Sequence, residues 1–214
     1  MPFRKIIFEN GQYYHVFNRS IGRQPIFAHT YNAQRFIEAV EYYQKSNPPI
    51  RFSIYRRQKR YFDKISQSNL VSILAFILMP NHFHFLIRQE ETFGIKQFIQ
   101  KLSNSFSHYY NLKHERRGPL FENTFRVVHV ETETQLIHLS RYIHLNATTS
   151  FLTEDPLLYP YSSYPAYMNR NTMSWLDKTF LLNHFKTPQR YARFVLDNKD
   201  YQRRLKYIEH LTLD

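Results

Sequence analysis

The sequence predicts an α+β fold, in which helices alternate with a mostly antiparallel sheet, for the greater part of its 214 residues. Three observations lead to this prediction. Two apolar runs, 72–79 and 82–88, are joined by a Pro-Asn turn dipeptide and therefore indicate a hairpin of two strands. Apolar residues then recur at helical spacing over 95–113. A short β-branched run at 125–131 precedes a second helical pattern at 133–146.

The elements before the hairpin complete this pattern. Residues 11–19 predict a first strand, whose odd-numbered side chains share one face and whose even-numbered side chains share the other. A helix is predicted from Tyr31 to about Gln44, with Thr30 as its candidate N-cap. The basic and aromatic residues 51–63 indicate either a strand extension or an insertion. The resulting order of elements is typical of a ferredoxin-like or RRM-like antiparallel sheet with helices on one face.

We expect this α+β domain to occupy residues 1–150. A C-terminal extension, 151–214, follows it and is expected to be mostly helical. The chain changes character beyond Tyr167, where residues 175–184 and 188–211 predict two further helices. These helices could brace the core or contribute basic side chains to a partner.

Two histidines share one face of the second hairpin strand. His82 and His84 lie about 7 Å apart along an extended strand, so both could reach one metal ion. Imidazole is the commonest protein metal ligand. The alternative is that each histidine is an ordinary half-buried polar group. Two ligands do not complete a metal site, so a third ligand is needed from another element.

The helix predicted at 133–146 offers both a third ligand and a nucleophile. Tyr142 and Asn146 lie one turn apart on the same helical face. If this helix packs beside the histidine strand, Asn146 could supply an oxygen ligand and Tyr142 a phenolic nucleophile. A phenol is mostly protonated near neutrality, but it can attack phosphorus where a cation stabilises the developing charge. The alternative is that Tyr142 is an ordinary aromatic residue, one of 17 tyrosines.

The composition favours a polyanionic partner. Lys and Arg number 29 against 17 Asp and Glu, giving a net charge of +12, and 17% of the residues are aromatic. Such a chain can offer cations to phosphates and rings to bases, although any one basic residue could equally be a solvated charge. We expect the 113–117 segment to lie beside the histidine face. The candidate DNA contacts are Arg19, Arg23, Arg56, Arg57, Lys113, Arg116, Arg117, Arg203 and Arg204.

Several classes of site and location are disfavoured. The chain has no cysteine, which excludes thiolate zinc sites, disulfides and a cysteine nucleophile. Its first residues lack the apolar region of a signal peptide. The longest apolar run is far too short to span a membrane. We therefore expect a cytoplasmic protein without a membrane partner.

Five short segments, met in the right order, resemble the HUH single-tyrosine transposases and most narrowly the REP-associated tyrosine transposases. The segment from Met79 to Leu86, MPNHFHFL, carries the His-hydrophobic-His motif. The resemblance spans about residues 10–167. The other matching segments are 11–20 (GQYYHVFNRS), 118–121 (GPLF) with 125–126 (FR), 141–146 (RYIHLN) and 159–164 (YPYSSY).

This resemblance implies a metal-dependent enzyme that cuts and joins single-stranded or hairpin DNA, as a monomer or a homodimer. His82 and His84 would hold Mg²⁺ or Mn²⁺ with Asn146 as third ligand. Tyr142 would attack the DNA, leaving a 5′-phosphotyrosyl enzyme and a free 3′-OH that a later step can rejoin. One departure is visible: the family commonly has Asn-Pro-Val after the tyrosine helix, whereas this chain has Asn-Ala-Thr at 146–148.

Two rival functions belong to other classes. The chain could be a non-catalytic nucleic-acid-binding module with an aromatic sheet and a basic rim. It could also be a metal-dependent phosphodiesterase that activates water. Cleavage that depends on Tyr142 would exclude the first rival, and a covalent protein–DNA adduct would exclude the second.

Overall fold

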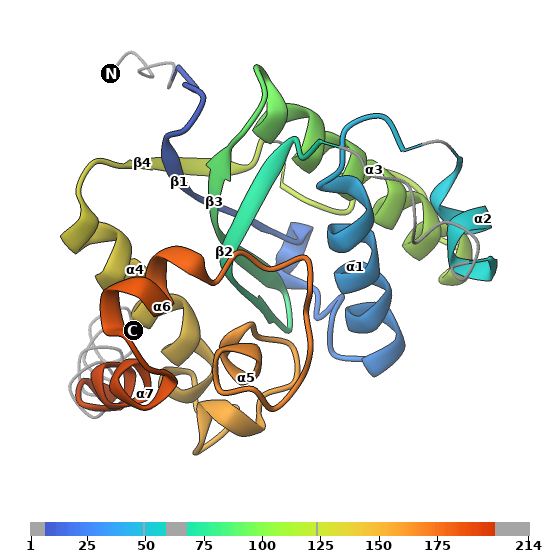
Figure 1. Cartoon of the computed structure of the whole chain (residues 1–214). Helices are drawn as coiled ribbons and strands as arrows, with labels where there is room; N and C mark the ends of the chain where they lie inside the picture. Colours follow the sequence, from blue (N-terminus) through green and yellow to red (C-terminus); the bar gives the residue numbers. More distant parts are fainter. Residues whose placement is uncertain (1–6, 49, 59–67, 123, 200–214) are drawn as a thin grey trace, which may run out of the picture.

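The computed structural model describes residues 7–48, 50–58, 68–122 and 124–199. In this part of the chain, four antiparallel strands form one sheet in the order β2-β3-β1-β4 (Figure 1). This order confirms the predicted ferredoxin-like α+β class. The strands are β1 (Tyr13–Arg19), β2 (Val71–Met79), β3 (His82–Gln89) and β4 (Arg126–Val130).

Helices cover both faces of this sheet, which corrects the prediction of helices on one face. Two long helices, α1 and α3, cover one face, and α4 packs on the other face against β2 and β3 (Figure 1). The described α-helices are α1 (Thr30–Tyr43), α2 (Phe52–Arg57), α3 (Gly94–Lys113), α4 (Glu133–Thr149), α5 (Tyr164–Tyr167), α6 (Thr179–Phe185) and α7 (Pro188–Leu196). The short 3₁₀ turn η1 (Ile21–Arg23) precedes α1, and η3 (Pro156–Leu158) lies between α4 and α5. None of the described helices is both long and apolar enough to cross a membrane.

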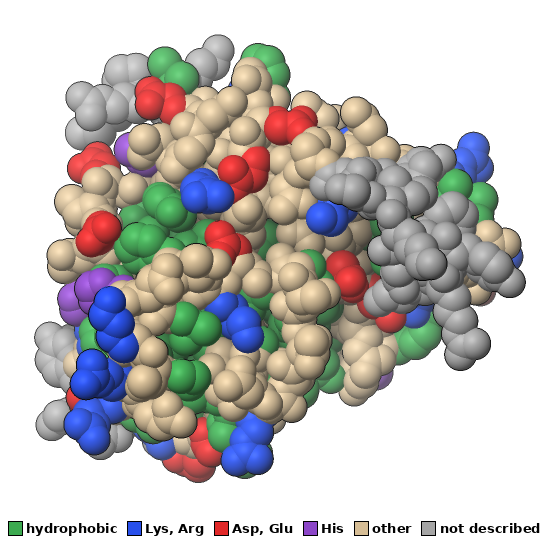
Figure 2. Space-filling view, viewed as in Figure 1, with side chains coloured by type: hydrophobic (Ala, Val, Ile, Leu, Met, Phe, Trp, Pro, Cys, Tyr) green, Lys and Arg blue, Asp and Glu red, His purple; other side chains and the backbone are tan. Residues whose placement is uncertain are grey.

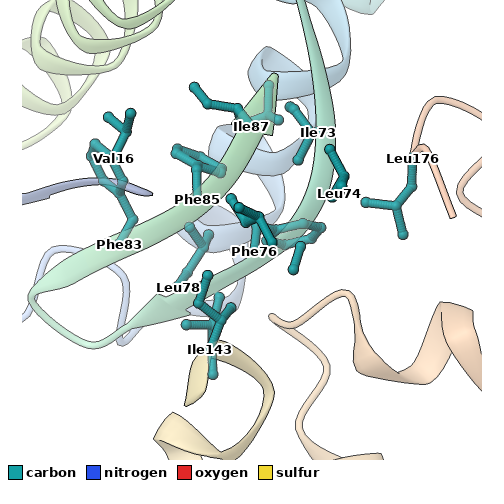
Figure 3. Packing of buried hydrophobic residues seen from close by; sticks show 14 of the residues in the cluster. Val16, Ile73, Leu74, Phe76, Leu78, Phe83, Phe85, Ile87, Ile143 and Leu176 are labelled. Carbon is teal, nitrogen blue, oxygen red and sulfur yellow. The ribbon is translucent and has the colours of Figure 1, made fainter. Parts of the chain in front are cut away.

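The core lies between the sheet and helices α1 and α3. Phe83 and Phe85 point to this side, with ring centroids 5.4 and 6.5 Å from Phe36 of α1. Phe85 also lies 5.9 Å from Phe98 of α3 (centroid to centroid), and Figure 3 shows Phe83 and Phe85 among the packed residues. Burying each such ring contributes about 1.5–3 kcal/mol. The phenylalanine face of this strand, opposite the face of His82 and His84, therefore packs on helices.

The opposite face of the two central strands carries the predicted site. In the register of β1 and β3, Phe17 lies opposite His84 and Arg19 opposite His82. Residues directly opposite each other in an antiparallel pair point to the same face. The odd-numbered side chains of β1 therefore share the histidine face, and α4 packs on this side of the sheet.

The C-terminal segment closes the free edge of β2. The backbone N–H of Leu78 donates to the carbonyl of Tyr161 (2.8 Å), and that of Asp177 donates to the carbonyl of Ile73 (2.9 Å). Exposed edges of this kind can pair with other chains. The same segment contributes buried side chains, among them Leu181, to the core that the sheet builds.

The N-cap predicted for the helix at 31–44 and the start predicted for the helix at 175 were wrong. The N-cap of α1 is His29, because the Thr30 hydroxyl instead accepts a hydrogen bond from Tyr161. Of the two alternatives left open for 51–63, the strand extension is excluded for the described residues, which form helix α2 with buried Phe52 packed against Tyr42 of α1. Residues 59–63 lie outside the described residues. The helix expected from residue 175 begins at Thr179.

Two helices were predicted in the C-terminal segment, and the structure describes α6 and the first part of the second, α7. The start of α6 follows Asp177, whose carboxylate accepts from the Thr179 N–H at 3.0 Å. Trp175 precedes this helix and stacks on Phe76 of β2. The helix predicted over 188–211 is described as α7 up to Leu196, and residues 200–211 lie outside the described residues.

Candidate active site

A pocket of about 370 Å³ opens where β1, β3 and α4 meet. It brings together the two strand histidines and the two helix residues that the sequence singled out. The residues that line it are His15, Phe17, Asn18, Arg19, His82, His84, Glu122, Arg126, Tyr142 and Asn146.

The two strand histidines lie close together and cross at a steep angle. The ring centroids of His82 and His84 are 5.0 Å apart, with 83° between the ring planes. The Nδ1 atom of His82 lies 2.6 Å from the Asn81 side-chain oxygen, which can only accept. Nδ1 of His82 is therefore the protonated nitrogen, and Nε2 carries the lone pair that a metal ion would take.

His15 of β1 contacts the second of these histidines. Its Nε2 lies 2.9 Å from Nδ1 of His84, and the two rings stack with centroids 5.1 Å apart. Burial lowers the pKa of His15 to about 4, so this imidazole is neutral at pH 7. The sequence placed His15 on a face of the first strand but assigned it no role. Only the pairing of β1 with β3 could have identified it.

Tyr142 lies beside both imidazoles and remains accessible. Its side chain is 42% exposed. The ring meets His84 edge-on, with centroids 5.8 Å apart and 89° between planes, and meets His15 in the same way at 6.2 Å. A phenol in this position can be reached by a DNA strand from solvent while staying next to the predicted metal ligands.

Asn146 lies one helical turn further along and is 2% exposed. Its side-chain oxygen, Oδ1, makes no hydrogen bond with any described residue. A buried carbonyl oxygen without a partner costs about 1–3 kcal/mol. A buried oxygen without a hydrogen bond, in a residue that lines a pocket, is expected of a cation ligand before the cation binds.

The side chains at the pocket provide three ligands for a divalent cation only if the Asn146 amide oxygen is one of them. No group of three or more His, Asp or Glu side chains among the described residues could hold a metal ion. Two imidazole nitrogens and one amide oxygen remain at the pocket, and nitrogen and oxygen donors of this kind bind divalent metals. His82, His84 and Asn146 therefore fit the predicted metal site.

The orientation of α4 follows from its buried residues. Thr132 caps the helix, because its hydroxyl accepts from the Gln135 N–H at 3.1 Å. Ile143 is fully buried and points toward Leu78 of β2 (Figure 3). His144 is also fully buried and faces the C-terminal segment. With these residues held on other sides, the remaining face of α4 turns Tyr142 toward the pocket.

The helix also continues further than predicted. It was expected to end near Asn146, but α4 extends to Thr149. Ala147 is fully buried and compatible with helix, whereas the proline common in similar sequences removes a backbone donor from a helix interior. Asn146 therefore lies within the last full turns of α4.

The pocket contains two charged residues that the sequence analysis did not select. Glu122 and Arg126 both line it, together with the predicted Arg19. Glu122 directly follows the segment 118–121, and Arg126 is part of the segment 125–126; both segments resemble a family pattern, which was the available signal. The Glu122 backbone N–H donates to the Arg19 carbonyl (2.8 Å), which holds this segment beside the end of β1.

Lys113 and Arg56, two of the other basic candidates, lie away from this pocket. Lys113 is on the opposite face of the sheet, where its Nζ donates to Asn32 Oδ1 (3.2 Å) and lies over the Tyr31 ring. The expectation that it lies beside the histidines was wrong, because α3 packs on the phenylalanine side. Arg56 is also on that side, where it pairs with Glu38.

The remaining candidates are scattered. Arg116 donates to Asn111 Oδ1 (2.7 Å) and Arg117 lies beside it, at the end of α3. The positions of Arg23, in η1, and Arg57, at the end of α2, are solvent-exposed. Arg203 and Arg204 lie outside the described residues.

Two further basic surfaces are present. A cavity of about 1100 Å³ lies between α1, α2 and α3, far from the histidine face, and no acidic side chain of the described residues lines it. Lys and Arg side chains also gather over α6 and α7 (Figure 2), where Lys186, Arg190 and Arg193 are exposed. The basic side chains of the large cavity are Arg35, Arg51, Lys101 and Lys113.

Comparison with known proteins identifies the family of this chain. Residues 9–146 match the family described as "Transposase IS200 like". No curated protein matches the chain. A solved structure of a REP-associated tyrosine transposase bound to a REP hairpin has a similar fold, with a TM-score of 0.56, 13% identity, and coverage of 83% of this chain and 98% of that one. The family match covers more than half of the chain and includes His82, His84 and α4 as far as Asn146. The chain therefore belongs to the IS200-like transposases, enzymes that cleave and join DNA.

Proposed function

We propose that this transposase cuts single-stranded DNA through a covalent intermediate on Tyr142. The phenolic oxygen attacks a backbone phosphorus, a Tyr–O–P bond forms, and the P–O3′ bond breaks. The phenol loses its proton, and the 3′ oxygen takes up a proton and leaves as a 3′-OH, while the 5′ phosphate stays on the enzyme. The observation that carries the proposal is the position of Tyr142, edge-on to His84 at the mouth of a pocket that contains the buried Asn146 oxygen.

We further propose that His82, His84 and Asn146 hold Mg²⁺ or Mn²⁺. Bound there, a divalent cation would neutralise charge on the scissile phosphate. The support for this set is the Asn146 Oδ1 atom, which is buried without a hydrogen bond among the described residues. Asn81 would not contact the cation itself. Its side-chain oxygen holds His82 in the tautomer with the lone pair on Nε2, the nitrogen that would bind the cation.

The remaining pocket residues would orient the DNA. Arg19 and Arg126 line the pocket and can each bind a phosphate oxygen with a guanidinium fork. The phosphotyrosyl bond conserves the energy of the broken DNA bond. Attack by a DNA 3′-OH on that bond would therefore reverse the reaction and join strands without another energy source.

We propose hairpin DNA as the substrate. A protein of the same fold has been solved with a REP hairpin, and a folded DNA element needs binding surfaces beyond one small pocket. The large cavity between α1 and α3 and the Lys and Arg side chains over α6 and α7 offer such surfaces (Figure 2). Basic and aromatic side chains together suit phosphates and unstacked bases.

The test uses labelled single-stranded oligonucleotides made from hairpin repeats that flank the gene. They are incubated with protein and Mn²⁺ or Mg²⁺ and separated on a denaturing protein gel. We expect label that migrates with the protein and that disappears with chelator or in Tyr142→Phe. Tyr13→Phe, at the opposite end of β1 from the pocket, is the matched control and should keep the adduct.

Two other outcomes would contradict the proposal. Cut DNA without an adduct, unchanged in Tyr142→Phe, would indicate a phosphodiesterase that activates water. Binding without cleavage, with both metals and several hairpins, would indicate a non-catalytic module.

A further inference from the structure

His15 makes a contact that the proposed chemistry does not use. It lies on β1, diagonally across from His84 on β3, and its Nε2 is 2.9 Å from His84 Nδ1. The two rings stack with 20° between their planes. On its other sides the His15 ring meets Phe17, at 4.8 Å between centroids, and the edge of Tyr142. These contacts limit how far the His15 ring can turn.

One proton lies between the two nitrogens, and its position decides what His84 can bind. If His84 Nδ1 donates, the lone pair of the neutral His84 ring is on Nε2, which can bind a cation. If His15 Nε2 donates instead, the neutral His84 ring carries its proton on Nε2 and cannot bind a cation there. The two arrangements have the same heavy-atom distance but opposite consequences.

The neighbouring histidine indicates which arrangement applies. Nδ1 of His82 donates to the Asn81 oxygen at 2.6 Å, which places the lone pair of His82 on Nε2. His15 occupies the equivalent position relative to His84, beside its Nδ1. Metal-binding histidines commonly donate their second ring N–H to a nearby acceptor, which fixes the tautomer and the ring orientation. Both histidines thus have a partner at Nδ1.

We propose that His15 is a positioning residue, which accepts a hydrogen bond from His84 Nδ1 and keeps Nε2 of His84 available to a divalent cation. This inference rests on the proposed function, because it concerns the same cation site. His15 does not contact the cation in this arrangement. It acts through His84, as Asn81 acts through His82.

The first test reads the tautomer directly in the metal-free protein. Imidazole ¹⁵N NMR distinguishes a protonated Nδ1 from a protonated Nε2 and needs neither metal nor DNA. In the wild type we expect His84 with its proton on Nδ1. In His15→Phe, which keeps an aromatic ring in the stack but has no acceptor, we expect the His84 signals to move toward the other tautomer. A wild-type His84 protonated on Nε2 would overturn the proposal.

The second test measures Mn²⁺ affinity by electron paramagnetic resonance. Loss of such an outer partner typically weakens metal binding about 10–100-fold, and we expect His15→Phe to fall in this range. His15→Gln offers an amide oxygen as acceptor and should recover most of the affinity. The matched control is His129→Phe on β4, where the ring lies against Tyr14 and does not line the pocket. Its Mn²⁺ affinity should equal that of the wild type.

The outcomes separate this inference from the proposed function. If the wild type binds no Mn²⁺, the proposed cation site fails, and the role of His15 fails with it. If the wild type and His15→Phe bind Mn²⁺ equally well, only the role of His15 is overturned. If His15→Phe does not fold, His15→Gln and the wild-type tautomer still decide the question.

Discussion

Asn146 carries a polar atom whose position favours ligand binding over stability of the fold. Its Oδ1 is buried without a hydrogen bond among the described residues. We expect Asn146→Ala to leave the unfolding free energy of the metal-free protein unchanged or to raise it by about 1 kcal/mol, because the unsatisfied oxygen is removed. The same variant should lose Mn²⁺ affinity and adduct formation. Urea denaturation and the labelled-DNA gel measure the two effects.

Asn32→Ala is the matched control for this experiment. Asn32 is also fully buried, but its side chain donates to the Ile26 carbonyl (3.1 Å) and accepts from the Tyr109 hydroxyl (2.8 Å). Removing it leaves partners unsatisfied and should cost about 1–3 kcal/mol. Equal destabilisation by both substitutions would argue that Asn146 is an ordinary structural residue.

His144 makes the stability of the protein sensitive to acid. It is fully buried, and its nitrogens lie 2.7 Å from the Ser163 hydroxyl and 2.7 Å from the Tyr191 hydroxyl. Burial lowers its pKa from 6.5 to about 3. Between these values the unfolded chain binds more protons than the folded one, so stability is full above about pH 6.5 and falls as the pH decreases toward 3. The loss from this residue is on the order of a few kcal/mol.

Urea denaturation at pH 7.5 and at pH 4.5 measures this effect. The wild type should lose stability over this interval, and His144→Gln should lose less, even if it starts from a lower stability. Part of the decrease will remain in the variant, because burial also lowers the pKa of His15, to about 4. An unchanged pH dependence in His144→Gln would contradict the assignment.

At the scale of elements, strand β2 depends on the C-terminal segment for the hydrogen bonds along the edge that faces away from β3. Its pairing with β3 is interrupted between Ile73 and Ala75, and the carbonyl of Leu74, at this irregularity, accepts from the buried Tyr167 hydroxyl at 2.7 Å. Tyr167→Phe would leave this carbonyl without that donor. We expect a loss of about 1–3 kcal/mol in unfolding free energy, measured by urea denaturation.

Tyr110→Phe is the corresponding control. Tyr110, on α3, is only partly buried and makes ring contacts with Phe106 and His114. Removing its hydroxyl should change stability by no more than about 0.5 kcal/mol. A similar loss in both variants would show that the Tyr167 hydroxyl has no special part in closing the edge of β2.

At the scale of the whole molecule, the net charge of +12 should make DNA binding strongly salt-dependent. Each phosphate contact to single-stranded DNA releases counterions and adds about 0.7 to the slope of log affinity against log salt. Arg19→Gln removes one cation from the pocket, and we expect it to reduce this slope by about that amount. Fluorescence anisotropy with a labelled oligonucleotide, across a salt titration, measures the slope.

Arg88→Gln provides the control for the salt titration. Arg88 lies at the far end of β3, where it pairs with Glu90 at 2.8 Å. Replacing it changes the net charge by the same amount as Arg19→Gln, but away from the pocket. An equal change of slope in the two variants would mean that Arg19 acts only through total charge and makes no phosphate contact.

Much of this molecule follows from local patterns in the sequence. Alternation along 82–88 separates the phenylalanine face from the histidine face, and the four-residue spacing of Tyr142 and Asn146 places them together on a helix. These periods depend on backbone geometry that adjacent residues already specify. Both groupings could therefore be predicted without knowledge of the fold. The structure places all four predicted active-site residues around one pocket.

What the sequence could not specify depends on contacts between distant segments. The register of β1 against β3 brings His15 to His84, 69 positions away in the chain. The packing of α3 on the phenylalanine side carries Lys113 away from the site. No repeating pattern of nearby residues predicts either outcome, because each depends on which buried faces meet in the folded chain. The tertiary structure alone therefore reveals the partner of His84 and the separation of the basic surfaces.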